Sequence, residues 1–395
     1  MPRVLRIINR FNLGGPTYNA AYLTRYMSPE FHTILVGGMI EETEENSEFI
    51  IRNLGLVPMT LTEMHRSLNP VNDSMALRKI SEIIEDFKPD IVHTHASKAG
   101  ALGRRAAHKM EVPIIIHTFH GHVFDAYFSG IKSLIYQNIE RSLARISTKI
   151  IALSENQKQD LVEKYRICPE EKIRIIPLGF DLKRFCENTD EKRKKFRSDY
   201  LLDDDEIAIG IIGRIVPIKN HSLFLEGIKY VSEKSGKKIR AFIVGDGEDK
   251  CKVGEKCHDL KLGCVDFTAE KRKAPVTFTS WIKDIDCVNA GMDIIALTSL
   301  NEGTPVSLIE AQAAGKPIIS TNVGGVGNIV VPGKTALLSD FNIKGDFQKK
   351  LLQLVQDEDL RNSLSSKGWE FVNKNFSYDR LVQDMKDLYY ELLSK

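Results

Sequence analysis

The sequence contains no uninterrupted apolar run of the roughly 18 to 20 residues that a membrane-spanning helix needs. Its longest apolar segments are only as long as strands, as at residues 114–116. The first residues, MPRVLRIINRFNLGG, are broken by Arg3, Arg6 and Arg10 and lead directly into a glycine turn, which indicates a first strand instead of a secretory signal. The sequence therefore predicts a cytoplasmic protein.

The sequence also lacks an excess of charge of either sign. Its 55 Lys and Arg residues against 53 Asp and Glu residues leave a formal net charge of +2. Nucleic-acid-binding domains are usually much more basic, so we expect no nucleic-acid partner. Any anion that the protein binds must be recognised by local groups.

Cysteine is present, but without the spacings of a disulfide framework or a common zinc site. The six cysteines include no CxxC pair. The closest group, Cys251, Cys257, His258 and Cys264, has gaps that do not match common zinc patterns, although a metal site remains an alternative. We interpret these residues as reduced thiols on a helix and the turn after it, and we predict no metal.

A chain of 395 residues with 42% hydrophobic residues can bury two cores, because single cores stop growing near about 250 to 300 residues. Strand-like segments alternate with helical ones, which predicts an α/β fold with a parallel sheet in each half. The expected strands are 4–9, 33–36, 91–94, 114–118, 149–153 and 173–177, then 207–213, 240–245, 276–280, 293–299 and 317–321.

The predicted domains are residues 1–180 and 206–375. Between them, residues 181–205 are strongly charged with both signs and little apolar material, which indicates an interdomain linker and a solvated helix. The last residues, 376–395, are expected to form a helix that crosses back. Its apolar stripe consists of Leu381, Met385, Leu388 and Leu392.

The most informative motif is SLNEGTPVSLIEAQAAGKPIISTNVGG at residues 299–325. Thr304 is a good N-cap and Pro305 a good first helical residue, so a helix should start there with its amides at the carboxyl ends of the strands. Such a helix end suits a phosphate. Glu302 and Glu310 flank it, and a carboxylate can accept hydrogen bonds from two vicinal hydroxyls of a sugar ring; compensation of the helix dipole is the alternative.

Two further loops follow strands of the same half. In the first, Gly213 precedes Arg214 and Lys219 in GRIVPIKN, and these two cations can neutralise a diphosphate. In the second, Gly245 and Gly247 mark a tight turn after the strand 240–245. A basic pair alone is usually a solvated surface, but its combination with the two glutamates favours a binding site.

Histidines cluster in the first half, with His117, His120 and His122 in HTFHGH at the end of a strand. We interpret their spacing as placing all three on one side, without the carboxylate or cysteine that a zinc site would add. One histidine is expected to bind the donor sugar or phosphate while the others are structural. His93 and His95 end the preceding strand, where a core role and a role at the rim of the site are both open.

Gly14 and Gly15 end the first strand and open a helix in the manner of a phosphate loop. They lack the full GxGxxG pattern, so the sequence does not predict a dinucleotide site.

Together these motifs resemble those of the retaining GT-B glycosyltransferases of family 4. The resemblance covers nearly the whole chain: the GG turn, His120, GRIVPIKN, IVGDGE, and Glu302 to Glu310 as the E-x7-E signature. It implies an α/β GT-B fold of two Rossmann-like parallel-sheet domains facing across a cleft, with a C-terminal helix packing across the domains. It also implies catalysis without a metal.

By this resemblance, Arg214 and Lys219 bind the diphosphate, Glu310 the ribose and Glu302 the transferring sugar, while His120 lies near the donor sugar and its leaving phosphate. These residues except Glu310 are the predicted catalytic set. The full set predicted to bind donor and nucleotide is Gly14, Gly15, Gly213, Arg214, Lys219, Gly245, Gly247, Ser280, Trp281, Glu302, Gly303, Thr304, Pro305, Val306 and Glu310. The basic and polar segment 266–275 is expected to be an exposed loop before the strand that leads to Ser280 and Trp281.

The predicted activity is transfer of a sugar, with retention, from a nucleoside diphosphate sugar to a hydroxyl of a glycan or lipid-linked acceptor. The resemblance favours a UDP-sugar and a role in surface polysaccharide or glycoconjugate biosynthesis. A sugar-nucleotide epimerase and a non-catalytic nucleotide-sugar-binding protein are the alternatives. Residues 127–145 and the basic residues of 98–109 suggest a peripheral contact with the inner membrane face or a lipid-phosphate acceptor; a core helix and a solvated face are the other interpretations.

Overall fold

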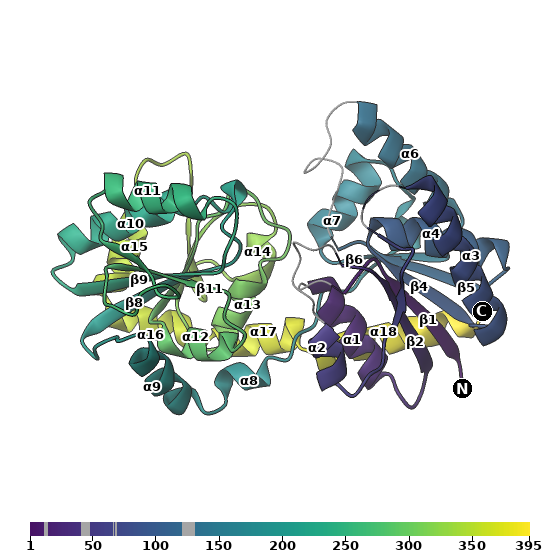
Figure 1. Ribbon diagram of the computed structural model, residues 1–395, viewed down its shortest axis with the longest axis horizontal. Coiled ribbons are helices and arrows are strands. Elements are labelled where there is room, and N and C mark those ends of the chain that lie inside the picture. Colours follow the sequence, from purple (N-terminus) through teal and green to yellow (C-terminus); the bar gives the residue numbers. More distant parts are fainter. Residues whose placement is uncertain (12–14, 41–47, 66, 68, 121–130) are drawn as a thin grey trace. The chain divides into compact units, whose positions relative to one another are not determined.

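The computed structural model describes residues 1–395 except 12–14, 41–47, 66, 68 and 121–130 (Figure 1). Its contacts divide the chain into two compact units. The first consists of Met1–Phe180 together with Asn375–Lys395, and the second of Asp181–Lys374. Among the described residues, every helix is too short or too polar to span a membrane.

The first unit is built on a sheet of seven parallel strands in the order β3-β2-β1-β4-β5-β6-β7. Runs of Ile and Val make the central strands buried on both faces, as parallel sheets require. The strands are β1 (Arg3–Ile8), β2 (His32–Gly38), β3 (Met59–Leu61), β4 (Ile91–His95), β5 (Ile114–Thr118), β6 (Lys149–Ala152) and β7 (Ile173–Ile175).

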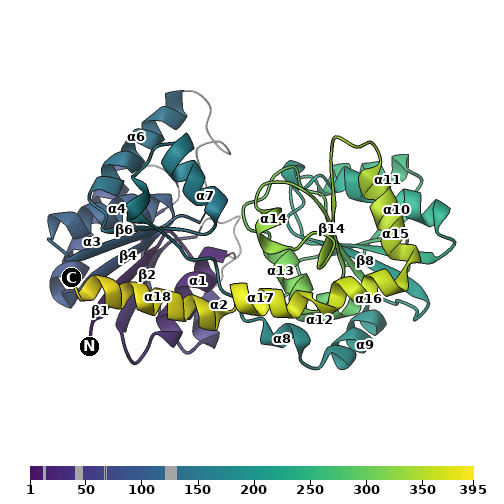
Figure 2. The ribbon, with the colours of Figure 1, turned by 180° about the vertical axis from the view of Figure 1, so that it is seen from behind.

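Helices cover both faces of this sheet. The α-helices are α1 (Gly15–Tyr26), α2 (Glu48–Asn53), α3 (Pro70–Phe87), α4 (Ser97–Lys109), α6 (Ile131–Arg145), α7 (Glu155–Gln159) and α18 (Tyr378–Leu393). Apolar residues of α3 and α4 form one core with β1 and β4, and α18 closes the other face (Figure 2). The start of α3 follows from its sequence, because the Asn69 side chain accepts from two backbone amides and Pro70 occupies the first turn.

The C-terminal helix α18 belongs to the first unit. Its predicted apolar stripe, Leu381, Met385, Leu388 and Leu392, is buried against β1, β4 and β5. The Ser377 hydroxyl caps its N-terminus by accepting from the backbone amide of Arg380. The hydrophobic pattern therefore correctly predicts both the helix and its buried face.

The second unit repeats the plan with the strand order β10-β11-β9-β8-β12-β13-β14, again all parallel. Its strands are β8 (Glu206–Ile212), β9 (Lys238–Val244), β10 (Cys264–Asp266), β11 (Val276–Ser280), β12 (Ile294–Leu297), β13 (Ile318–Thr321) and β14 (Ala336–Ser339). The sequence predicts the central strands of both sheets. It does not predict β3, β10 or β14, which are three or four residues long and lie at sheet edges.

The helices of the second unit again lie on both faces (Figure 1). They are α8 (Lys183–Cys186), α9 (Thr189–Asp199), α10 (His221–Lys234), α11 (Lys250–Asp259), α12 (Ile285–Gly291), α13 (Val306–Ala313), α14 (Val326–Ile329), α15 (Asp346–Gln356), α16 (Glu358–Ser366) and α17 (Gly368–Phe376), whose last residues enter the first unit. Helices α10, α11 and α15 share one apolar core with β8 and β9.

The predicted linker at 181–205 is wrong, because this segment is part of the second unit. Its helix α9 packs on α12 through Phe196, which lies so close to Gly291 that an added Cβ would come within 2.2 Å of the ring. The charged residues are not simply solvated. Arg193 and Arg197 both pair with Asp293, at 2.7 and 3.3 Å. Part of the charge of this segment therefore belongs to specific ion pairs.

Candidate active site

Three loops of the second unit meet where its strands end. They are residues 213–220 after β8, 245–249 after β9 and 299–305 after β12, and we call them the strand-end loops. Backbone hydrogen bonds join them: the amide of Ile215 donates to Asp246 O at 2.9 Å and that of Leu300 to Ile218 O at 2.8 Å. The carboxyl ends of parallel strands share one edge of a sheet, so the motifs separated in sequence become neighbours.

The predicted cation Lys219 and the predicted carboxylate Glu302 are in direct contact. Lys219 Nζ lies 2.5 Å from Glu302 Oε1, and the Ser299 hydroxyl donates to the same oxygen at 2.5 Å. Both charged side chains are largely buried, with exposed fractions of 21% and 10%. The ion pair holds both side chains in place. A bound anion would also contact Lys219, and a bound sugar hydroxyl could donate to Glu302.

Arg214 follows Gly213 in the first strand-end loop and is exposed. Among the described residues, its guanidinium has no hydrogen-bond or ion-pair partner. The adjacent amides of Gly213 and Ile215 are bonded to Val244 O and Asp246 O, so the backbone that carries this side chain is fixed. Arg214 therefore offers its donors to a ligand from an ordered loop.

Two of the predicted glycines are required by the close approach of the loops. Gly245 has φ of 139°, and an added Cβ would lie 2.0 Å from Gly213 O. At Gly247 an added Cβ would lie 2.3 Å from Ile215 O. Gly213 itself has φ of 151°, which L side chains rarely adopt. The absence of side chains at these glycines lets the loops pack closely, and this packing sets the positions of neighbouring residues that can bind a ligand.

A second pair of glycines, Gly324 and Gly325, has the same role and was not predicted from the sequence. An added Cβ at Gly325 would lie only 1.7 Å from Gly303 O, and one at Gly324 would lie 2.1 Å from Glu302 O. The amide of Gly325 also donates to Glu302 O at 2.9 Å. The signal was present as the GG that follows the strand β13.

Helix α13 starts one residue later than predicted. It begins at Val306, and Pro305 occupies the cap position with ψ of 97°, so Thr304 lies before the helix and makes no side-chain cap. The extended ψ of Pro305 itself, and not the proline's effect on Thr304, moves the start of the helix to Val306. The Pro305 carbonyl accepts from the amide of Leu308 at 3.1 Å. The amides of the first turn still point out of the helix end, next to exposed Gly303.

Glu310, the second carboxylate of the E-x7-E signature, lies on α13 and is partly buried. Burial raises the pKa of its carboxyl from the usual 4.5 to about 7; Arg184 on α8 opposes this effect and Asp286 on α12 adds to it. Among the described residues, no side chain donates a hydrogen bond to it. Burial therefore destabilises the ionised form of Glu310 at neutral pH, and hydroxyl donors of a bound ligand would stabilise that form.

Ser280 and Trp281 follow β11 beside the second strand-end loop. Ser280 has a positive φ of 59°, and its hydroxyl donates to Asp246 Oδ2 at 3.0 Å. The Trp281 ring passes close to Gly245 and is 44% exposed, so part of an aromatic face is accessible. The preceding segment 266–275 is only partly the exposed loop that was predicted, because Phe267 and Ala274 are buried.

The histidine of the first unit that was predicted to bind the donor is His120, just beyond β5. Its Nε2 lies 3.0 Å from His95 Nδ1. Burial lowers the pKa of His120 to about 3, so the ring is neutral at neutral pH. The prediction that all three histidines lie on one side is wrong for His117, which is bonded to Thr94 on the opposite face of the sheet. Residues 117 and 120 are three positions apart, and strand alternation separates such positions.

His122 and Gly14 lie outside the described residues. Gly15 is the first residue of α1, where an added Cβ would lie 3.2 Å from a methyl group of Leu178. This close contact explains a small residue at the start of the helix.

Helix α4 carries the basic residues considered as a face for a lipid phosphate, namely Lys98, Arg104, Arg105 and Lys109. That interpretation is wrong for two of them. Arg104 is fully buried and pairs with Glu140 at 2.7 Å, which joins α4 to α6. Lys98 pairs with Asp73 at 2.5 Å and is 10% exposed. Their charges are used inside the fold and do not create a basic surface.

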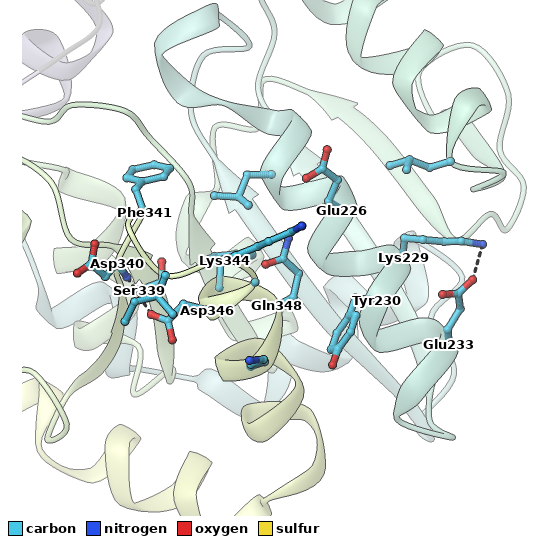
Figure 3. Close-up of a pocket in the computed structure, with 16 residues that line it drawn as sticks. Glu226, Lys229, Tyr230, Glu233, Ser339, Asp340, Phe341, Lys344, Asp346 and Gln348 are labelled. Atoms are coloured by element: carbon cyan, nitrogen blue, oxygen red, sulfur yellow. Dashed lines mark hydrogen bonds and ion pairs between the residues drawn. The ribbon is translucent and has the colours of Figure 1, made fainter.

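A pocket of about 560 Å³ lies in the second unit between α10 and residues 339–349 (Figure 3). Charged residues of both signs line it together with Tyr230 and Phe341, and Lys229 pairs with Glu233 at 3.0 Å on its rim. None of its lining residues belongs to a strand-end loop. We assign it no part in the site.

Within the described residues, no three His, Cys, Asp or Glu side chains are grouped so that they could hold a metal ion. All six cysteines are free thiols. Burial, with Cys264 adjacent, raises the pKa of Cys257 to about 12, so it is an unreactive thiol of the core of α11.

Comparison with known proteins identifies the family. The model described as Glycosyltransferase Family 4 matches residues 14–184, and the one described as Glycosyl transferases group 1 matches residues 192–371. The UDP-Gal:alpha-D-GlcNAc-diphosphoundecaprenol alpha-1,3-galactosyltransferase of Escherichia coli is 30% identical over 332 residues, which are 83% of this chain and 82% of that protein. The chain is a family 4 glycosyltransferase. The capsular polysaccharide biosynthesis glycosyltransferase CapM of Staphylococcus aureus is 26% identical and covers 84% of each chain.

Solved structures show that this glycosyltransferase has the GT-B fold. HepE of Anabaena in complex with UDP has a TM-score of 0.79 at 16% identity, covering 99% of this chain and all of that one. The sucrose-phosphate synthase of Thermosynechococcus elongatus has a TM-score of 0.80 at 16% identity, with both chains fully covered. The predicted fold class, family and enzyme class are therefore confirmed. The roles of individual site residues stay predictions.

Proposed function

We propose that this glycosyltransferase transfers a sugar from a UDP-sugar, with retention of anomeric configuration, to a hydroxyl of a glycan or lipid-linked acceptor. The observation that carries the proposal is the set of strand-end loops in the second unit, which are joined by backbone hydrogen bonds. They carry both the Lys219–Glu302 pair and Arg214, whose side chain has no partner among the described residues. The choice of UDP is supported by the E. coli relative, named for UDP-Gal, and by HepE, solved with UDP-glucose.

The cations act on the leaving group. Arg214 and Lys219, with the first amides of α13, balance the diphosphate charge that grows as the bond to the anomeric carbon breaks. Each charge-assisted hydrogen bond contributes roughly 1.5 to 3 kcal/mol when partly desolvated. The two cations take over the neutralisation that a divalent ion performs in other transferases, so no metal is needed.

The glutamates act on hydroxyls. Glu302 accepts hydrogen bonds from the transferring sugar once the diphosphate draws Lys219 away, and Glu310 accepts from the ribose. His120 of the first unit, a neutral imidazole, contributes a hydrogen bond to the donor sugar. The acceptor oxygen bonds to the anomeric carbon on the face from which the diphosphate leaves, and its proton passes to a departing phosphate oxygen.

A two-stage experiment tests this function. Thermal shifts with UDP, GDP and ADP identify the base, because a ligand that binds only the folded state raises its apparent stability. The preferred nucleotide sugar is then incubated with a panel of glycan and lipid-diphosphate acceptors, and NMR gives the anomeric configuration of the product. Inversion, or turnover that needs a divalent ion, would contradict the mechanism.

Arg214→Ala is the informative variant because this exposed side chain has no structural partner among the described residues. We expect loss of turnover and a weaker UDP shift at unchanged stability. Arg272→Ala removes another exposed arginine of the same unit, outside the strand-end loops, and should keep full activity. Unchanged turnover in Arg214→Ala would refute the assignment.

The acceptor is the least constrained part of the function. The E. coli relative is named for a diphosphoundecaprenol-linked acceptor and CapM for capsular polysaccharide, which favours an acceptor of surface polysaccharide or glycoconjugate biosynthesis. Leu134 and Ile135 on α6 are 55% and 53% exposed and fit a peripheral contact with the inner membrane face. Co-sedimentation with anionic vesicles, compared with the Leu134→Ser variant, tests this contact.

A further inference from the structure

A continuous set of buried polar side chains leads from the C-terminal helix to His120, all within the first unit. Arg6 on β1 and His93 on β4 are register partners, so they lie side by side on the sheet face that α18 covers. His95 lies two residues further along β4 on the same face. Tyr389 reaches them from α18. Arg6, His93, His95 and Tyr389 are 0% exposed.

These groups form contacts in sequence. Arg6 Nη2 donates to the Tyr389 hydroxyl at 3.1 Å, and this hydroxyl lies 2.7 Å from His93 Nδ1. The His93 ring stacks on the His95 ring at a centroid distance of 4.3 Å. His95 Nδ1 is 3.0 Å from His120 Nε2. The orientation of His120 thus depends on His95, which is itself held between the stacked ring and the hydrogen bond.

The charge in this network lies on Arg6. Its guanidinium has no carboxylate partner within the described part of the chain, and it also contacts Thr24 Oγ1 at 2.9 Å. Arginine stays protonated in proteins. Burial and this nearby positive charge lower the pKa of His93 and His95 well below the usual range, so both rings stay neutral.

Neutrality restricts what His120 can present. A neutral imidazole carries one proton, so one of its nitrogens donates and the other accepts. In the hydrogen bond between His95 and His120, only one of the two facing nitrogens carries a proton. The tautomer of His95 therefore determines whether Nδ1 of His120 donates or accepts. This Nδ1 is buried without a partner among the described residues, so it is the atom left for a ligand.

We propose that His95 is a positioning residue for His120. Its stack on His93, which Arg6 and Tyr389 support, fixes the ring orientation, and through the shared hydrogen bond its own tautomer selects the single neutral tautomer with which His120 binds a sugar hydroxyl. The ligand part of this inference rests on the proposed function, but the effect on the His120 ring does not. Neutral His120 suits a hydroxyl, whereas a protonated ring would suit a phosphate anion.

The first test reads the His120 ring in the protein without ligands. Two-bond ¹H–¹⁵N correlations of histidine side chains distinguish the two tautomers and the protonated ring. We expect one neutral tautomer of His120 in the wild type between about pH 6 and pH 8, a range in which an ordinary histidine titrates. A mixture of tautomers, or protonation near pH 6.5 (about the ordinary value), would overturn the proposal without any variant.

The second test uses two substitutions of His95. Asn can place an amide near the former Nδ1, whereas Leu fills the space without a polar group. We expect His95→Leu to release the His120 tautomer and lower kcat by about 10- to 100-fold with little change in the donor KM, because misplacement of a binding group costs such factors. His95→Asn should restore most of the tautomer preference of His120 and most of the kcat. The control is His117→Leu, an equally buried histidine on the opposite face of the sheet.

The outcomes separate the two proposals. A fixed His120 tautomer and unchanged kcat in folded His95→Leu, or equal losses in the His117→Leu control, overturn the positioning role. If the ring responds as expected but no nucleotide sugar is turned over by the wild type, the proposed function fails and the network remains. Where His95→Leu does not fold, the wild-type spectrum alone decides.

Discussion

Glu310 should make the second unit less stable above neutral pH. Its carboxyl pKa lies near 7 in the folded unit, against the usual 4.5, because it is buried. As pH rises, the unfolded chain loses this proton first, so the free energy of unfolding falls between pH 4.5 and 7 and stays lower above that range. At about 1.4 kcal/mol for each pKa unit the full loss is about 3 kcal/mol. Because the side chain is partly accessible, solvent screening reduces the lower end to about 2 kcal/mol.

Glu310→Gln removes the ionisation and keeps the shape. We expect this variant to unfold with less than about 1 kcal/mol of difference from the wild type at pH 5 and to be about 2 to 3 kcal/mol more stable at pH 8. Both tryptophans of the chain, Trp281 and Trp369, lie in the second unit, so urea unfolding followed by fluorescence reports on the unit that contains Glu310. Glu358→Gln, an exposed glutamate on α16, controls for loss of one charge.

Glu310→Gln also tests whether the gain in stability weakens UDP binding. If Glu310 accepts from the ribose, the stabilised Gln variant should bind UDP more weakly at pH 8, since natural sites keep strained groups where ligands need them. An equal stability difference at pH 5 and pH 8, or an equal gain in the Glu358→Gln control, would refute the reasoning from burial.

Three further predictions concern packing and charge. Gly325→Ala should displace the facing loop and abolish turnover, whereas Gly327→Ala, whose added Cβ meets no atom within 4 Å, should not; steady-state kinetics of both decide. Glu140→Ala leaves Arg104 buried and unpaired and should cost about 3 to 5 kcal/mol by calorimetry, against less than about 1 for Glu48→Ala in an exposed pair. Lys219→Ala should weaken UDP binding at least about tenfold by titration calorimetry, because it removes a charge-assisted bond of about 1.5 kcal/mol or more.

The fold could be predicted because the strongest signal is alternation of buried strands with helices. Central strands such as β5 and β11 are predicted with their observed bounds, since they are rich in β-branched residues and lie between polar segments. The edge strands β3, β10 and β14 were not predicted, because three or four residues are too few to show a clear hydrophobic period; β7, which is equally short and lies at an edge, was predicted.

The strand-end loops could be predicted from the same logic, because every motif in them follows a recognisable strand. What the sequence did not reveal is how closely they pack. Gly325 and Gly303 carry no pattern that links them, although their backbones nearly touch. The charged segment 181–205 was misread for a related reason, since composition cannot distinguish a solvated charge from one paired with Asp293.

The histidine network lies beyond sequence reasoning for a geometric reason. Tyr389 and His93 are separated by 296 positions, and Arg6 was counted only as an interruption of an apolar segment. An unpaired arginine at the centre of a sheet is costly unless donors and acceptors surround it, and α18 supplies the hydroxyl that both Arg6 and His93 use. The C-terminal helix therefore supplies a hydrogen-bond partner to Arg6 and His93 behind His120 as well as covering an apolar face. Removing it would expose the stripe and leave the charge of Arg6 beside the histidines without that hydroxyl.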